Sequence, residues 1–495
     1  MALKIALLLA SLSSTLAADS ASFKLTTKRV ADIPARFVSF SIEVGSAPEV
    51  FLVGGLGGAP RASLARLFNA LREAAGDERG PMVRVGGNSA DESAYVPTGD
   101  LPNGTTYRIS DADLEAYAAV VPMWNGSLVI DITLRYPGSP GADLDVAHLK
   151  AVGDKVGWDL VEGIEVGNEV DLFFENGIRD SSYVYRDYRP EYALVSKAIA
   201  PVVAPAGRPM VQGATWCSTH WSVANFTSYI NEFASDFASL SLHRYAASVC
   251  HNDKATIPEL MADKAAALLA QDLAPWTAPA IAKGIPIFIG EGNSVSCGGA
   301  SGVSDVWASA LWAIDVLFSV ATVGIQRWSF HGMPKGAYSS IDFPSGSSDV
   351  AQVRPIFYGL WAFATAAGHG STIREVQVAH STNGFIKCWS VTDASGAARV
   401  VVLHKDPAAT QTASVTITPA SALSGAATLV RGLPGKNGIA SAWDDSISFG
   451  GLTFSTTTDG TPAGTPTSEP VAASGGAYTF ALPAASFAIL TLPTA

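Results

Sequence analysis

The sequence predicts an α/β protein in which a (β/α)8 TIM barrel is followed by a C-terminal all-β sandwich domain. Strand-like and helical segments alternate from residue 36 to residue 368, which is the pattern of such a barrel. Beyond Gly368 the helical periodicity disappears, and short strand-like runs are separated by Ser, Thr, Gly and Pro turns. The length of 495 residues exceeds the roughly 250 residues of a typical barrel and leaves room for a second domain.

The barrel prediction rests on eight apolar runs that each have the length of a strand. These predicted strands are Phe37–Val44, Met82–Gly86, Leu128–Leu134, Ile164–Glu169, Met210–Trp216, Leu240–Tyr245, Ile285–Glu291 and Ile325–Phe330. The helical segments between them include Arg61–Ala75, Ala112–Val120, Pro190–Val203, Ile257–Leu269 and Ser304–Val320, the last with Ser304 and Asp305 as its start. An open doubly wound sheet is the alternative, but no glycine-rich nucleotide-binding motif follows the first strand.

The sandwich prediction rests on strand-like runs in the last part of the chain. They are Thr372–Val378, Phe385–Val391, Arg399–His404, Ala413–Ile417, Tyr478–Leu482 and Phe487–Leu492. Residues 23–27 are expected to add an edge strand to this domain, and residues 456–475 to form an exposed loop. The predicted domains are therefore an N-terminal strand that joins the sandwich (18–35), the barrel (36–368) and the sandwich itself (369–495).

The first 17 residues are predicted to be a secretory signal peptide. Lys4 supplies a positive charge, residues 5–10 form an apolar run, and residues 15–17 form a small-residue cleavage pattern. Three Asn-X-Ser/Thr sequons agree with a secreted glycoprotein, and their asparagines are Asn103, Asn125 and Asn225. We therefore expect an extracellular protein.

The charge balance restricts the partners of the chain. With 32 Lys and Arg against 44 Asp and Glu, the net charge is −12. Such a protein has no basic stripe to displace counterions from phosphates, which argues against nucleic acid as a partner. An acidic protein is also unsuited to an anionic membrane surface. We expect a monomer.

Four cysteines are too few for a disulfide scaffold: Cys217, Cys250, Cys297 and Cys388. They lack paired Cys-X-X-Cys spacing and nearby histidines, so the sequence predicts neither a metal site nor a cofactor. One disulfide is expected in an oxidising compartment, and we predict it between Cys250 and Cys297 because both belong to loops at one rim of the barrel. The spacing alone does not establish this pairing.

Two carboxylates stand at the carboxyl ends of predicted barrel strands, which is where TIM barrels carry their chemistry. Glu169 ends the fourth predicted strand and Glu291 ends the seventh, and these strands lie on opposite sides of the barrel mouth. Each glutamate follows an apolar run and is preceded by Asn or Gly. Glycosidic cleavage needs such a pair, one carboxyl group to protonate the leaving oxygen and the other to attack or to position water. An exposed loop glutamate is the alternative interpretation for each.

The motifs around these glutamates resemble those of the retaining clan A glycoside hydrolases. More narrowly, the chain resembles glycoside hydrolase family 79, which includes β-glucuronidases and heparanases. The similar segments are Arg84-Val85-Gly86-Gly87-Asn88, Gly163-Ile164-Glu165-Val166-Gly167-Asn168-Glu169, Leu242-His243-Arg244-Tyr245 and the all-β tail, roughly residues 23–495 in all. Asn-Glu alone is specific only to the clan, whereas the ensemble is more specific to the family.

The resemblance implies a role for each matching residue. Glu169 would be the general acid/base and Glu291 the nucleophile that forms a glycosyl-enzyme intermediate. The residues expected to bind the sugar are Glu43, Asn88, Asn168, His243, Tyr245, Gly298, Gly299, His331 and Tyr338. A core histidine or a packing tyrosine is the alternative for members of this set. His243 and Tyr245 share parity on one strand, so both side chains are expected to point inward.

A glycine pair after the nucleophile carries the prediction of substrate class. The family has Tyr-Gly-Gly there, whose backbone N–H groups receive the glucuronate carboxylate, and this chain has Cys297-Gly298-Gly299. Backbone without side chains lets amides approach an anion closely. The cysteine departs from the family pattern and removes a hydroxyl donor, which leaves a modified uronic acid open as the substrate. An ordinary rim loop is the alternative.

The sequence thus favours a secreted retaining exo-β-glucuronidase that removes glucuronic acid or its 4-O-methyl ether from glycans such as arabinogalactan side chains. A heparanase-like endo-β-glucuronidase and a neutral-sugar clan A glycosidase are the enzymatic alternatives. The net charge of −12 argues against the basic cleft that sulfated glycans require. A non-catalytic carbohydrate-binding protein is the alternative of a different class, and it would have no need for both glutamates.

Overall fold

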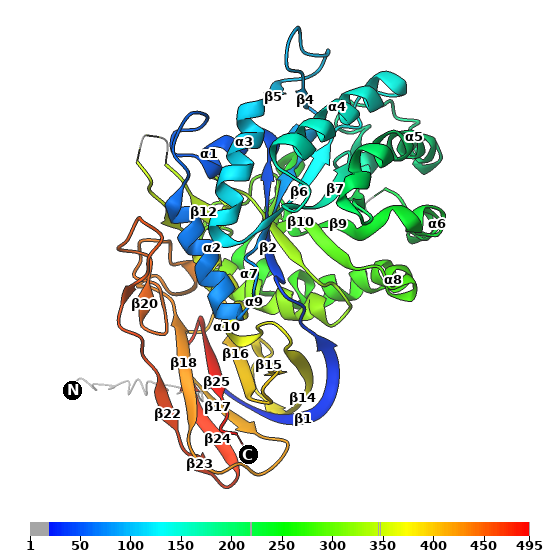
Figure 1. The fold of residues 1–495 in the computed structure, drawn as a ribbon. Helices are drawn as coiled ribbons and strands as arrows, with labels where there is room; N and C mark the ends of the chain where they lie inside the picture. The colour runs from blue at the N-terminus through cyan, green and yellow to red at the C-terminus, as the bar shows by residue number, and fades with distance from the viewer. Residues whose placement is uncertain (1–18, 218–219, 345, 347, 495) are drawn as a thin grey trace, which may run out of the picture.

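The computed structural model describes residues 19–217, 220–344, 346 and 348–494. Two bodies make up this part of the chain, a closed barrel with helices around it and a β-rich domain beneath it (Figure 1). The predicted fold class, a TIM barrel with a C-terminal β sandwich, is thus confirmed. The predicted signal peptide lies outside the described residues.

Eight parallel strands close the barrel in the order β2-β3-β6-β7-β8-β9-β10-β11, with β11 pairing back to β2. Their bounds are β2 Val38–Glu43, β3 Met82–Gly86, β6 Ser127–Ile132, β7 Val161–Val166, β8 Val211–Trp216, β9 Phe237–Ser248, β10 Ile287–Ser296 and β11 Trp328–His331. Each of the eight predicted strands overlaps one of these. Strand β10 continues five residues past Glu291, because pairing with β9 resumes at Glu291 after a register shift between Ile289 and Glu291.

Helices surround the barrel (Figure 1). Their bounds are α1 Ala47–Phe51, α2 Ala62–Ala75, α3 Asp111–Val120, α4 Ser139–Lys155, α5 Tyr185–Val203, α6 Val223–Phe233, α7 Ile257–Met261, α8 Ala267–Lys283, α9 Ala308–Ala321 and α10 Pro355–Ala366. Two short strand pairs lie in the connections: β4 Ser93–Tyr95 pairs parallel with β5 Tyr107–Ile109, and β12 Ile341–Asp342 pairs antiparallel with β13 Gln352–Val353. Among the described residues, no helix combines the length and apolar character that crossing a membrane requires.

Two helix predictions were wrong in detail. The segment predicted as one helix, 257–269, is split into α7 and the start of α8, and the carbonyl of Ala265 between them accepts a hydrogen bond from the Trp312 indole at 2.8 Å. The helix predicted to begin at Ser304 begins at Ala308 instead. The Ser304 hydroxyl accepts from the backbone N–H of Ala300, so it stabilises the preceding loop and does not cap the helix.

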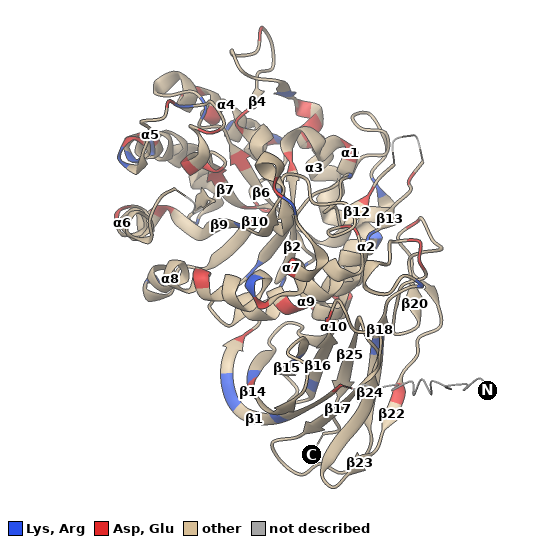
Figure 2. Ribbon diagram, turned by 180° about the vertical axis from the view of Figure 1, so that it is seen from behind, with Lys and Arg blue, Asp and Glu red and all other residues tan. Residues whose placement is uncertain are grey.

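In the described part of the chain, a thirteen-strand sheet builds the β-rich domain. Its strands are β1 Ser20–Asp32, β14 Thr372–Ser381, β15 Ile386–Thr392, β16 Ala398–His404, β17 Ala413–Thr418, β18 Ala427–Leu433, β19 Ser448–Phe449, β20 Leu452–Thr453, β21 Ala463–Gly464, β22 Glu469–Val471, β23 Ala473–Ser474, β24 Ala477–Leu482 and β25 Ser486–Thr491. Strands β18, β19 and β20 were not predicted, and the segment predicted as an exposed loop, 456–475, contributes β21, β22 and β23. Lys and Arg are interspersed with Asp and Glu over both bodies (Figure 2).

Strand β1 lies inside the sheet and not at its edge, contrary to the sequence prediction. It pairs antiparallel with β14 and parallel with β17, and Figure 1 shows it curving along β14. Ala21, Phe23 and Leu25 alternate into the sandwich core. Over residues 20–24 the strand has neighbours on both sides, which satisfies both rows of its backbone hydrogen-bonding groups, and the rest of its 13 residues pair with β14 alone.

Helix α9 lies between the two bodies and contacts both of them. Every one of its residues is buried. Trp307, just before it, stacks on Phe487 of the sandwich and donates its indole N–H to the carbonyl of Ala485 at 2.7 Å. Within the helix, Asp315 pairs with Lys405 at 2.6 Å and accepts from the Trp389 indole at 3.1 Å. The pair is almost inaccessible to solvent, so the contact between the domains includes a buried ion pair.

Replacing Lys405 with methionine is expected to lower the free energy of unfolding by about 3–5 kcal/mol, because Asp315 would stay buried without its counter-ion. Urea unfolding measures this effect. The double variant Lys405→Met/Asp315→Asn is expected to recover much of the loss, since the amide still accepts from Trp389. Lys28→Met, which breaks an exposed pair with Glu375, is the control and is expected to cost at most about 1 kcal/mol. Equal losses for Lys405→Met and Lys28→Met would contradict the prediction.

Candidate active site

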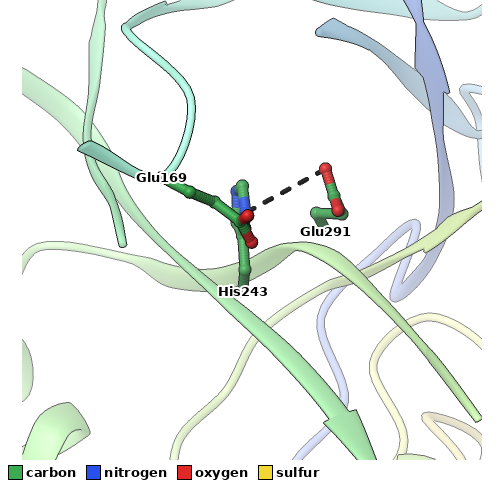
Figure 3. A group of neighbouring side chains, drawn as sticks. All are labelled: Glu169, His243 and Glu291. Carbon is green, nitrogen blue, oxygen red and sulfur yellow. Dashed lines mark hydrogen bonds and ion pairs between the residues drawn. The ribbon is translucent and has the colours of Figure 1, made fainter. Parts of the chain in front are cut away.

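Glu169 and Glu291 come together at the carboxyl end of the barrel, as the sequence predicts for strands four and seven. The side chains of Glu169, Glu291 and His243 face one another (Figure 3). One oxygen of each glutamate and one nitrogen of His243 all lie within 4.8 Å of one another. Glu169 is 8% exposed and Glu291 7%, so both carboxyl groups are nearly buried but still reach the surface.

Glu169 owes its position to a left-handed backbone. Strand β7 ends at Val166, and Glu169 follows with φ 49° and ψ 50°, a conformation that is uncommon for a residue with a side chain. Its N–H donates to the carbonyl of Thr215 on β8 at 3.0 Å, and the Thr215 hydroxyl donates to the carbonyl of Gly167 at 2.6 Å. These bonds tie the turn to the neighbouring strand. Oε1 of Glu169 then lies 3.0 Å from Nδ1 of His243.

Glu291 is held through both of its oxygens. The Tyr245 hydroxyl donates to Oε1 at 2.8 Å, and Nη1 of Arg84 donates to Oε2 at 2.7 Å. Nδ1 of His331 lies 3.6 Å from Oε2, and Nδ1 of His243 lies 4.0 Å from it. Burial is the largest single influence and raises the pKa of Glu291, but the charges of His331, His243 and Arg84 and the bond from Tyr245 together hold that pKa well below its ordinary value. The carboxylate is therefore ionised and fixed in orientation.

Tyr245 and His331 are adapted to this ionised carboxylate. Burial, followed by the charge of Glu291, raises the pKa of Tyr245 well above its ordinary value, so its hydroxyl stays protonated and donates. Burial lowers the pKa of His331, but the charges of Glu291 and Glu43 outweigh it and raise the pKa above the ordinary histidine value. Nε2 of His331 lies 3.6 Å from Oε1 of Glu43. His331 thus lies between two of the predicted site carboxylates, which favour its protonated form.

The remaining predicted residues lie around Glu169 and Glu291. Asn168 donates through its amide to the Oδ1 of Asn88 at 3.0 Å, and Asn88 is exposed at the start of the 3₁₀-helix η2 (Asn88–Ala90). Tyr338 packs against Tyr245 and His331, with ring centroids 6.3 and 5.9 Å away. Gly299 lies directly against the backbone of Tyr338. The structure therefore brings all of the predicted catalytic and sugar-binding residues into one region, and their roles remain proposals.

A buried arginine that was not predicted as a site residue lies beneath this ring. Arg84 on β3 is fully buried and donates to Glu165, to Asp131 at 2.9 Å, to the Oδ1 of Asn168 at 2.8 Å and to Glu291. Burial lowers its pKa, but the three carboxylates raise that pKa above the ordinary arginine value. One guanidinium thus holds both the predicted nucleophile and the residue before the predicted acid/base. The signal in the sequence that could have identified Arg84 is its position between two valines in an otherwise apolar strand.

The cluster of Glu169, His243 and Glu291 is compact enough to suit a metal ion. Both oxygens of Glu291 already accept hydrogen bonds from Tyr245 and Arg84, and the Arg84 guanidinium brings a positive charge to that carboxylate. A second cation at the same oxygens would be repelled by this charge. The donor set therefore favours proton-transfer chemistry between the two carboxyl groups.

The predicted Cys250–Cys297 disulfide is present. It joins the 3₁₀-helix η7 (Cys250–Asn252), which follows β9, to the residue directly after β10. The asparagines of the sequons differ in exposure, since Asn103 and Asn125 are exposed and Asn225 is half-buried in the first turn of α6.

Comparison with known proteins gives relatives in sequence and in fold. No family model matches the sequence. A β-glucuronidase from Aspergillus niger is 26% identical over 381 residues, which are 69% of this chain and 66% of that protein. A 4-O-α-L-rhamnosyl-β-D-glucuronidase from Fusarium oxysporum 12S, solved with Rha-GlcA, superposes with a TM-score of 0.75 at 19% identity over 95% of this chain and all of that one. A family 51 arabinofuranosidase from Xanthomonas axonopodis pv. citri has a TM-score of 0.64 at 12% identity over 96% of this chain and all of that one.

The chain is thus similar in sequence to a β-glucuronidase and similar in fold to solved glycoside hydrolases. It spans slightly less than two thirds of the length of the A. niger relative. The solved structures, both below 25% identity, show that nearly all of the chain shares their fold.

Asp91 ties three loops together behind the turn that carries Glu169. Its carboxylate accepts from the backbone N–H groups of Leu134 at 2.7 Å and Asn168 at 2.9 Å, and from the Thr133 hydroxyl at 3.3 Å. Burial is the dominant influence and raises the pKa of Asp91 to about 6, although these donors oppose the rise. The sequence analysis did not identify Asp91, because a single aspartate in a loop has no distinctive pattern.

The raised pKa of Asp91 predicts a pH dependence of stability. A carboxyl group whose folded pKa exceeds its unfolded pKa stabilises the fold fully below the unfolded value, near 3.8, and this contribution is lost as the pH rises through about 6. The contribution corresponds to about 3 kcal/mol. We expect the difference in unfolding free energy between wild type and Asp91→Asn to shrink from pH 4 to pH 7.5, measured by urea unfolding. Asp143→Asn, at an exposed position, is the control, and a constant difference for Asp91→Asn would contradict the prediction.

Proposed function

We propose that this protein is a secreted retaining exo-β-glucuronidase. The observation that carries the proposal is the closeness of the two carboxyl groups, one oxygen of Glu169 lying within 4.8 Å of one oxygen of Glu291. Retaining glycosidases place their carboxyl groups about 5–5.5 Å apart, whereas inverting enzymes leave about 6.5–9.5 Å for a water molecule. The spacing supports direct attack by one glutamate on the anomeric carbon.

The surroundings of Glu291 support the proposed roles. Glu291 is ionised and oriented by Tyr245 and Arg84, so it attacks the anomeric carbon and forms the glycosyl-enzyme bond. Glu169 gives its proton to the leaving glycosidic oxygen, and in the second step it takes a proton from the water that releases the sugar. Asn168, whose amide oxygen is held by Arg84, is placed to contact the 2-hydroxyl group, where hydrogen bonds strengthen in the transition state.

The substrate class rests on the groups beyond the two glutamates. The exposed Gly298 and the adjoining Gly299 lie beside Tyr338, and the positive charge of His331 is next to Tyr338. Backbone amides, a hydroxyl group and a nearby cation suit a carboxylate ligand. The relationship to the A. niger β-glucuronidase supports the same class. The proposed substrate is glucuronic acid, or its 4-O-methyl ether, at the ends of glycans such as arabinogalactan side chains.

Exo action and secretion complete the proposal. Exo action is supported by the acidic charge, because binding along a sulfated chain requires a basic surface. Secretion is supported by residues 1–17 and the three sequons.

A comparison of three aryl glycosides tests the proposal. We expect hydrolysis of p-nitrophenyl β-D-glucuronide, with kcat/KM at least about 100-fold above the values for the β-D-glucoside and the β-D-xyloside. Polarimetry or NMR during the reaction identifies the first anomer released, which is expected to be β. Preference for the glucoside would contradict the uronate assignment, and release of the α anomer would contradict the retaining mechanism. No hydrolysis of any of the three would favour a carbohydrate-binding protein.

A further inference from the structure

The carboxylate-binding loop, defined here as Cys297-Gly298-Gly299, has an unusual backbone. All three residues have positive φ angles, 58°, 90° and 82° in order. Only glycine adopts such angles without steric cost, so Cys297 occupies its position against its own preference. A chain with two adjacent glycines also has many alternative conformations. The direction of its N–H groups must therefore be imposed from outside the loop.

Covalent and hydrogen-bonding anchors stand on either side of the loop. On the N-terminal side, the disulfide to Cys250 fastens Cys297 to η7, at the end of the barrel strand that carries His243 and Tyr245. On the C-terminal side, the N–H of Ala300 donates to the Ser304 hydroxyl at 3.0 Å. Gly298 and Gly299 lie between these anchors.

The loop contacts residues that in turn touch the catalytic pair. A side chain at Gly299 would come within 2.6 Å of the backbone nitrogen of Tyr338, so loop and Tyr338 pack without a gap. Tyr338 packs against Tyr245, which donates to the nucleophile Glu291. A shift of the loop would therefore change where a carboxylate sits relative to Glu291.

We propose that the Cys250–Cys297 disulfide determines the preference of this enzyme for uronate substrates by holding the carboxylate-binding loop in its receptive conformation. The inference rests on the proposed β-glucuronidase function and adds a residue pair to it. Amides that already point at the anion bind it without an ordering cost, and a loop released from Cys250 incurs that cost in each binding event. The catalytic glutamates have their own anchors, so the disulfide acts on binding and not on the chemical step.

The double variant Cys250→Ser/Cys297→Ser tests this inference. We expect KM for p-nitrophenyl β-D-glucuronide and the inhibition constant of D-glucuronate to rise about tenfold, while kcat changes less than about threefold. The inhibition constant of D-glucose, which has no carboxylate, is expected to stay the same. Cys388→Ser, which removes a cysteine of β15 in the sandwich, is the matched control and is expected to leave all of these values unchanged.

Reduction of the folded wild-type enzyme provides a second measurement that does not depend on folding of the variant. Cys297 is exposed, so a dithiol can reach it. The dithiol is oxidised to its cyclic disulfide, and the two sulfur atoms gain two electrons and two protons to become two thiols, which a thiol titration counts. The same rise in KM is expected after reduction and is expected to reverse on reoxidation.

Two results would overturn the inference. Unchanged KM and D-glucuronate inhibition in both the double variant and the reduced enzyme would show that the disulfide serves stability alone. An equal loss for D-glucuronate and D-glucose would show general loosening of the site. Both of these results leave the proposed function intact, whereas a wild-type enzyme that does not hydrolyse the glucuronide would contradict the proposed function together with this inference.

Discussion

Replacing Glu291 with glutamine is expected to lower kcat on the glucuronide at least about 10⁴-fold, because an amide cannot form the glycosyl-enzyme bond. The fold should survive the change. The glutamine oxygen can still accept from Arg84, and its NH₂ group can donate to the Tyr245 hydroxyl. Steady-state kinetics and a thermal unfolding curve for the same sample measure the two effects separately.

Azide distinguishes the roles of the two glutamates. In Glu169→Ala, with a 2,4-dinitrophenyl leaving group that needs no protonation, azide is expected to displace Glu291 from the intermediate and to yield the β-glucuronosyl azide. In Glu291→Ala, azide occupies the vacated side and is expected to displace the phenolate directly, which yields the α-glucuronosyl azide. NMR of the products identifies each anomer. Exchanged anomers would mean that the roles are reversed, and near-normal turnover by either variant would remove that residue from the mechanism.

Substitutions of Arg84 are expected to have the second large effect, because they lower the free energy of unfolding or kcat. Arg84→Met leaves three carboxylates, Asp131, Glu165 and Glu291, buried without their shared cation, and we expect a loss of about 3–5 kcal/mol in the free energy of unfolding or failure to fold. Arg84→Lys keeps the charge but cannot reach the same partners with one ammonium group. The lysine variant is therefore expected to fold and to lose about 10²-fold or more in kcat.

The pH profile of Arg84→Lys distinguishes positioning from structural damage. Arg84 lowers the pKa of Glu291, so a weaker contact raises that pKa and moves the acid limb of kcat/KM to higher pH. A variant that is merely less stable would lose amplitude with an unchanged acid limb. Arg189→Lys, in an exposed pair with Glu232, is the control and is expected to keep wild-type kinetics. An unshifted acid limb in Arg84→Lys would contradict the positioning role.

Local patterns were sufficient to predict most of the barrel. Each barrel strand is a short apolar run, and a strand buried on both faces must be apolar wherever it occurs. Helix ends were less predictable. The hydroxyl of Ser304 could cap a helix or stabilise a loop, and in the folded chain it accepts from the N–H of Ala300 in the loop. The central place of β1 was also not predictable, since residues 20–32 meet β14 and β17 only after some 350 residues have folded.

The sequence by itself predicted the barrel and the placing of the two glutamates, because each glutamate follows a predicted strand and the ends of parallel strands must meet. The expected sugar-binding residues came from the family resemblance. Only the tertiary structure decided how these groups are charged and oriented. Arg84, Asp131 and Glu165 come from three strands, and they form one buried network because their side chains point into the same barrel interior. The state of Glu291 depends on distances to Arg84, Tyr245 and His331, and distances between residues remote in sequence exist only once the barrel has closed.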